Sequence, residues 1–116
     1  MAFDASTQAP ARVRHWLAEQ LTDGTREAAT LAVSEIVTNA LVHSGLEAGE
    51  AIDVQTVPAG ERMRVNVRHR GELFPAVASP APAGAAGGWG LIVVDSVSAA
   101  WGVEPAGERI VVWFEV

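Results

Sequence analysis

The sequence contains neither cysteine nor lysine, and these two absences exclude several kinds of site. Without cysteine there is no disulfide, no thiol nucleophile and no cysteine-based zinc site, and the composition fits a reducing cytosol, so we expect a cytoplasmic protein. The basic side chains are eight arginines without a long basic run, and the net charge is −6. An acidic chain of this kind binds nucleic acid poorly, so we expect no nucleic-acid partner.

Long apolar runs are also missing. No stretch is long enough to span a bilayer, and the chain does not open with a basic segment, an apolar run and a cleavage site, so no membrane association is expected. The 116 residues are 49% hydrophobic and 19% charged, the profile of a globular protein with one modest core. No repeat or boundary divides them, which predicts a single domain over residues 1–116.

Hydrophobic periodicity predicts three helices and four or five short strands. Helical spacing marks 11–21, 25–44 and 91–100, whereas alternation and turn signals mark hairpins at 51–57 with 62–68 and at 101–104 with 110–116. A further short strand is expected at 2–3, and the Pro-, Ala- and Gly-rich stretch 74–88 is expected to be a loop. This order predicts an α+β two-layer sandwich, with a mostly antiparallel sheet and three helices on one face.

The helix predicted over 25–44 carries three polar residues in one row. Glu35, Asn39 and His43 follow at intervals of four, and the apolar Leu31 and Val42 lie beside them. Such a row is often only a solvated helix face. The apolar neighbours favour the alternative that it forms the wall of a pocket.

Glycines mark two other places where a ligand could approach the backbone. Gly71 follows the second strand of the first hairpin, and Gly88 and Gly90 open the third helix ahead of Leu91. A helix start presents free N–H groups and a partial positive charge that suit phosphate oxygens. Glycines also often do no more than interrupt loops, so the signal depends on its combination with the polar row.

Together these motifs resemble the N, G1 and G2 boxes of the GHKL ATPase fold, which is also called the Bergerat-type ATP-binding fold. The stretch SEIVTNALVHS and the ending WGVEPAGERIVVWFEV are most similar to the single-domain anti-sigma factor serine kinases of that superfamily. The resemblance covers nearly the whole chain. It implies binding of ATP and Mg²⁺, protein-serine kinase activity, and a cavity closed by the segment 74–87 as an ATP lid.

The resemblance also implies roles for individual residues. Glu35 would be the catalytic general base, and Asn39 would be the Mg²⁺ ligand. The nucleotide-binding residues would come from the polar row and the glycine motifs. They are Asn39, His43, His69, Gly71, Gly88, Gly90 and Leu91. No specific role is implied for His43.

The G1 motif departs from the pattern of the family at two positions. The family has an Asp that accepts a hydrogen bond from the adenine amino group, and here His69 stands in its place. Leu73 stands where the family has its second Gly, which stiffens the hinge of the lid. A neutral imidazole accepts a hydrogen bond through one nitrogen only, and a protonated imidazole accepts none.

Three functional interpretations therefore remain open. The first is an ATP-binding anti-sigma factor with protein-serine kinase activity. The second is a degenerate relative that sequesters a protein partner without needing nucleotide, and the third is a fold relative with another regulatory task. In the first two, the partner is a sigma factor or an antagonist of the STAS-domain type, and a homodimer or a hetero-complex is expected.

Overall fold

The computed structural model describes residues 1–21, 24–74 and 88–116 of the protein. The elements follow in the order β1 (Ala2–Asp4), α1 (Ala9–Gln20), α2 (Arg26–His43), β2 (Ala51–Ala59), β3 (Arg62–Arg70), α3 (Gly88–Val97), β4 (Ala100–Ala106) and β5 (Arg109–Glu115). Among these residues, no helix is both long enough and apolar enough to cross a membrane.

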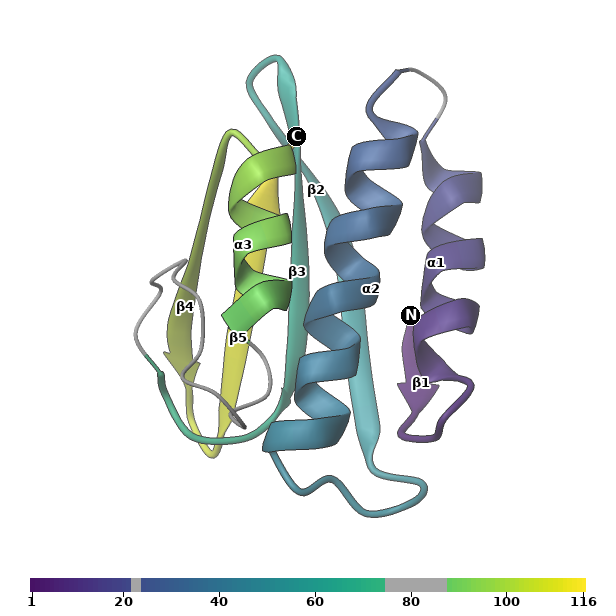
Figure 1. Ribbon diagram of the computed structural model, residues 1–116, viewed down its shortest axis with the longest axis vertical. Coiled ribbons are helices and arrows are strands. Elements are labelled where there is room, and N and C mark those ends of the chain that lie inside the picture. The colour runs from purple at the N-terminus through teal and green to yellow at the C-terminus, as the bar shows by residue number, and fades with distance from the viewer. Residues whose placement is uncertain (22–23, 75–87) are drawn as a thin grey trace.

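The strands form one antiparallel sheet in the order β1-β2-β3-β5-β4. All three helices lie on one face of this sheet, with α2 between α1 and α3 (Figure 1). The sandwich predicted from the periodicity is therefore confirmed. The strands alternate apolar and polar residues, and each helix carries an apolar stripe. The apolar face of the sheet and the stripes of the helices therefore bury each other.

The alternation along β3 separates the two faces of the sheet. Val65, Val67 and His69 are buried beneath the helices, whereas the intervening Arg64 and Arg68 lie on the opposite face. Val67 pairs with Val112 of β5, so a continuous apolar layer crosses the central strands. Its most completely buried large side chains include Phe114, Leu17, Ile36 and Ile52.

The third helix differs from its prediction at both ends. It begins at Gly88 and ends at Val97, whereas residues 91–100 were predicted. Glycines lower helix propensity, which concealed the first turn. At the other end the Ala99 amide donates to the Glu115 carbonyl, and Ala100 opens strand β4. The predicted loop at 74–88 falls largely on residues 75–87, which lie outside the described part of the chain.

Candidate functional site

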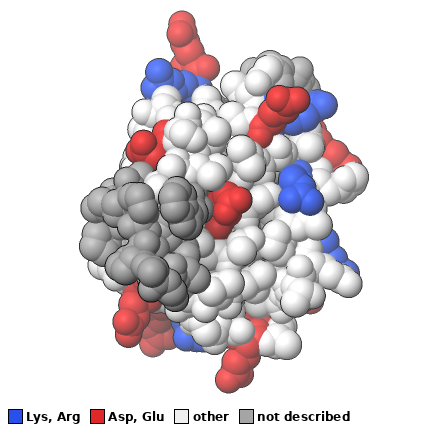
Figure 2. All heavy atoms as spheres, in the orientation of Figure 1, with Lys and Arg blue, Asp and Glu red and all other residues white. Residues whose placement is uncertain are grey.

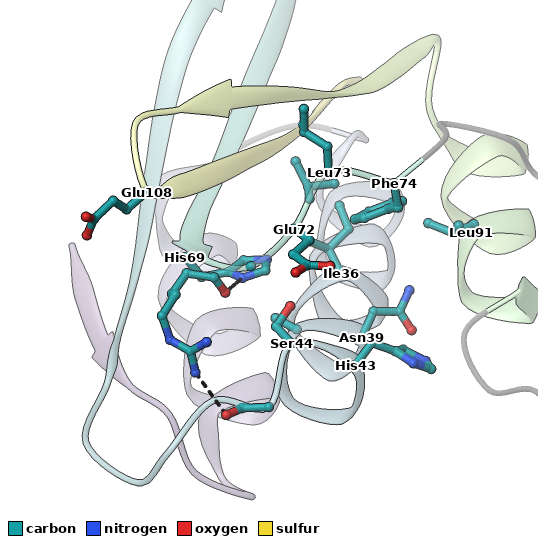
Figure 3. A pocket seen from close by; sticks show the side chains of 15 residues that line it. Ile36, Asn39, His43, Ser44, His69, Glu72, Leu73, Phe74, Leu91 and Glu108 are labelled. Carbon is teal, nitrogen blue, oxygen red and sulfur yellow. Dashed lines mark hydrogen bonds between the residues drawn. The ribbon is translucent and has the colours of Figure 1, made fainter.

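A cavity of about 830 Å³ lies where the C-terminal end of α2, the end of β3 and the start of α3 meet (Figure 3). This volume is within the usual range for small-molecule sites, roughly 300–1,000 Å³. Its apolar wall includes Ile36, Leu73, Phe74, Leu91 and Val112. Its polar wall consists of Asn39, His43, Ser44, His69, Arg70, Glu72 and Glu108.

Most of the residues predicted from the sequence for a site meet in this cavity. Asn39 and His43 reach it from α2, as Figure 3 shows, and His69, Gly71 and Leu91 complete the set. Asn39 is half-buried, whereas His43 is exposed at the mouth. The last turn of α2 and the end of β3 thus bring together motifs that are far apart in the sequence.

Three of the predicted positions stand apart from this group. Glu35 lies one helical turn before Asn39 and is not among the described residues that line the cavity. Gly88 and Gly90 form the first turn of α3, which leads into the lining residue Leu91.

His69 is the buried polar residue at the inner end of the cavity. Its side chain is only 2% exposed, and Nδ1 lies 2.9 Å from the Arg70 carbonyl oxygen. A carbonyl oxygen only accepts hydrogen bonds, so Nδ1 carries the proton and donates it. In the neutral ring Nε2 is then an unprotonated acceptor, and no hydrogen bond from a described residue occupies it.

The surroundings of His69 keep its ring neutral. Burial lowers the pKa of the imidazole below its ordinary value of 6.5, and the positive charges of Arg109 and Arg70 lower it further. The hydrogen bond to the Arg70 carbonyl opposes this shift but does not cancel it. At pH 7, therefore, His69 supplies the cavity with an uncharged hydrogen-bond acceptor.

Gly71 keeps the turn after β3 close to the end of α2. A Cβ atom at this position would lie 2.8 Å from the Ser44 hydroxyl oxygen and 3.4 Å from Cε1 of His69. A side chain at this position would therefore need the Ser44 hydroxyl to rotate away. The glycine predicted as part of a ligand motif also lets the turn after β3 pass close to Ser44.

Arg70 holds the loop between α2 and β2 at one side of the cavity by hydrogen bonds to Glu50 and Gly45. We call this arrangement, which sequence reasoning missed, the Arg70 clamp. Arg70 donates from Nε to Glu50 Oε1 at 2.7 Å and from Nη2 to Glu50 Oε2 at 2.9 Å. Nη2 also donates to the Gly45 carbonyl oxygen at 3.0 Å. The guanidinium and the Glu47 amide lower the pKa of the Glu50 carboxyl to about 2. The Nε and Nη2 donors of Arg70 are therefore both engaged by this loop.

The lining fits the base of a Mg²⁺-bound nucleotide better than its phosphates. An apolar cavity with a neutral acceptor suits a planar base that bears an amino group. At the polar end Asn39 offers a side-chain oxygen, but among the described residues no three His, Asp or Glu side chains are grouped to hold a metal ion. The described lining therefore fits the base, and toward a metal-bound phosphate it offers the single side-chain oxygen of Asn39.

Comparisons with known proteins agree with the fold described above. The family model of the histidine kinase-like ATPase domain matches residues 3–114. A solved structure of the RsbU and RsbW domains of Rv1364c from Mycobacterium tuberculosis aligns with a TM-score of 0.68 and 22% identity, over 99% of this chain and 31% of that chain.

A second solved structure has the same architecture. The histidine kinase domain of the blue-light activated histidine kinase EL346 from Erythrobacter litoralis aligns with a TM-score of 0.61 and 19% identity, over 92% of this chain and 58% of that chain. The chain thus spans about a third of the first relative and just over half of the second. At these identities the likeness establishes the fold. No curated protein gives a match.

Proposed function

Because the chain belongs to the histidine kinase-like ATPase domain family, we propose that it is a regulatory protein that binds an adenine nucleotide in the cavity and acts on a protein partner. The base lies against the apolar wall, and its amino group donates to Nε2 of His69. The observation that carries this proposal is the buried neutral imidazole, whose acceptor nitrogen is left available by the bond from Nδ1 to the Arg70 carbonyl.

The imidazole replaces a carboxylate acceptor without leaving the amino group unpaired. Loss of the partner of a buried donor costs about 1–3 kcal/mol, or roughly tenfold to a hundredfold in affinity. His69 avoids that cost because its tautomer is fixed. The departure of the G1 motif from the family pattern is therefore compatible with adenine recognition.

The partner in this proposal is a sigma factor or a STAS-domain antagonist. Support comes from the sequence resemblance to anti-sigma factor kinases and from the RsbW domain in the structurally similar chain of Mycobacterium tuberculosis. We assign no phosphoryl-transfer step, because Glu35 is not among the described lining residues. Glu35 as general base and Asn39 as magnesium ligand remain predictions from the resemblance.

Calorimetric titration with adenosine and with purine riboside, which lacks the amino group, tests the proposal. We expect adenosine to bind roughly tenfold to a hundredfold more tightly than purine riboside, since only adenosine donates to His69. His69→Phe keeps a ring but removes the acceptor, and it should abolish this preference. His69→Gln restores an acceptor oxygen and should recover part of it.

His15→Phe provides the matched control. His15 is exposed on α1 and pairs with Glu19 on the same helix, so its replacement should leave adenosine affinity unchanged. If neither adenosine nor an adenine nucleotide binds to the folded protein, the nucleotide part of the proposal is wrong. The alternative of a nucleotide-independent module that sequesters its partner would then stand.

A further inference from the structure

The distribution of charge around the cavity is unlike that of a polyphosphate site. Arg70 is the one Lys or Arg among the described residues that line it, and Glu50 holds its guanidinium with two hydrogen bonds. Glu72 and Glu108 add two carboxylates to the lining. The described lining therefore offers no arginine or lysine free of an ion pair, and it is net negative at pH 7.

The sequence explains why no other Lys or Arg is among the described lining residues. Residues 27–61 and 71–108 contain no Lys or Arg, and these two stretches supply all of the described lining except His69, Arg70 and Val112. By contrast, five of the eight arginines lie on the sheet face that the helices leave uncovered. These are Arg62, Arg64, Arg68, Arg70 and Arg109, as the alternation along β3 and its pairing with β5 require, and Arg70, at the end of β3, also borders the cavity.

The start of α3 is a further source of positive potential at the cavity. Its first turn offers free backbone N–H groups next to Leu91, and a helix N-terminus attracts anions through about half an elementary charge. Glu72 and Glu108 together carry about two full negative charges, and an exposed helix terminus is readily screened by salt. The balance opposes a highly charged phosphate chain.

We infer that the cavity recognises the nucleoside part of its ligand and gains no affinity from the phosphates, so that adenosine or AMP binds at least as tightly as ATP. This inference rests on the proposed function, because it concerns the ligand of the same cavity. The lining contains a fixed acceptor beside an apolar wall, whereas its other polar groups are amide, imidazole, hydroxyl and carboxylate side chains and an arginine already in an ion pair.

Titration of the full chain with adenosine, AMP, ADP and ATP tests this inference. In magnesium-free buffer with a chelator at low salt, affinity should stay level or fall as phosphates are added. Raising the salt concentration should bring the affinity for ATP up toward that for adenosine, because salt screens the repulsion. A site that grips phosphate would respond in the opposite way, losing affinity for ATP as salt rises.

The variant Glu72→Gln makes the test specific to the carboxylate. Removing one repulsive charge at the cavity should raise the affinity for ATP about twofold to fivefold relative to that for adenosine, as expected for charges in a partly solvated site. Glu61→Gln is the matched control. Glu61 lies in the turn before Arg62, at the opposite end of β3 from the cavity, and its replacement should leave the ratio unchanged.

The possible outcomes separate this inference from the function on which it rests. ATP binding tenfold or more tighter than adenosine, with or without excess Mg²⁺, would overturn the inference while the proposed nucleotide binding would stand. Failure of all four ligands to bind the folded protein would overturn both. Adenosine or AMP binding as tightly as ATP under both conditions would support both.

Discussion

At the residue scale, His69 illustrates how a buried side chain can change chemical type and keep its role. Burial lowers the pKa of the imidazole, so the unfolded chain binds a proton at a higher pH than the folded chain does. The stability that the neutral ring contributes is therefore complete above about pH 6.5 and decreases as the pH falls below that value. Protonation would also convert Nε2 from an acceptor into a donor, so adenosine affinity should decrease in the same direction.

Gly71 gives a second prediction at this scale. Gly71→Ala places a methyl group 2.8 Å from the Ser44 hydroxyl oxygen, so Ser44 or the turn must move. We expect a loss of about 1 kcal/mol in the free energy of unfolding, at the low end for overpacked positions because the Ser44 hydroxyl can rotate away. Urea denaturation measures the loss. In the Ser44→Ala background, where the hydroxyl is absent, the same substitution should cost less.

Gly24→Ala is the control for this prediction. Its added Cβ would meet nothing within 4 Å, so the free energy of unfolding should change little. An equal cost for Gly71→Ala in the presence and absence of the Ser44 hydroxyl would show that the close approach is not the reason for the glycine.

At the scale of elements, the Arg70 clamp joins the end of β3 to the loop between α2 and β2. Arg70→Ala removes the ion pair to Glu50 and the bond to the Gly45 carbonyl together. We predict faster amide hydrogen exchange in the loop 45–50, while exchange in the centre of β3 is unchanged. Arg68→Ala is the control, because Arg68 lies 3.8 Å from Asp53 and does not contact this loop.

The clamp also has a defined dependence on pH. The pKa of Glu50 falls from 4.5 to about 2 on folding, so the pair stabilises the folded state fully above about pH 4.5. Its contribution is lost as the pH falls from 4.5 toward 2. The difference in unfolding free energy between the wild type and Glu50→Gln should therefore shrink over that interval, and a constant difference would contradict the assigned pair.

At the scale of the whole molecule, one apolar layer unites the helices and the sheet, and this part was predictable from the sequence. The stripe on α2 and the alternation in β3 gave the layers because both patterns report burial directly. The first turn of α3 was missed because glycine suppresses the helical signal. The Arg70–Glu50 pair was missed because the two residues are 20 positions apart, and the hairpin register that brings them together is not visible in composition.

The candidate site was likewise predictable from the sequence in part only. The row from Asn39 to His43, together with Gly71, was found because these residues form recognisable local patterns, and the structure brings them to one cavity. What the sequence could not provide is the tautomer of His69, which depends on where the Arg70 carbonyl points. The distribution of charge around the cavity was also not predicted, because it depends on the strand alternation that directs most arginines to the uncovered sheet face. Figure 2 shows the helical face, where the few charged side chains form no patch.

The central claim is that His69 presents Nε2 to the cavity as an acceptor, and nitrogen NMR of the imidazole tests it most directly. At neutral pH the ring of His69 should show a protonated Nδ1 and an unprotonated Nε2, as the contact with the Arg70 carbonyl requires. Adenosine should shift the Nε2 resonance, and purine riboside should shift it much less. A protonated Nε2 at neutral pH, or a resonance that adenosine leaves unmoved while it binds, would contradict the account.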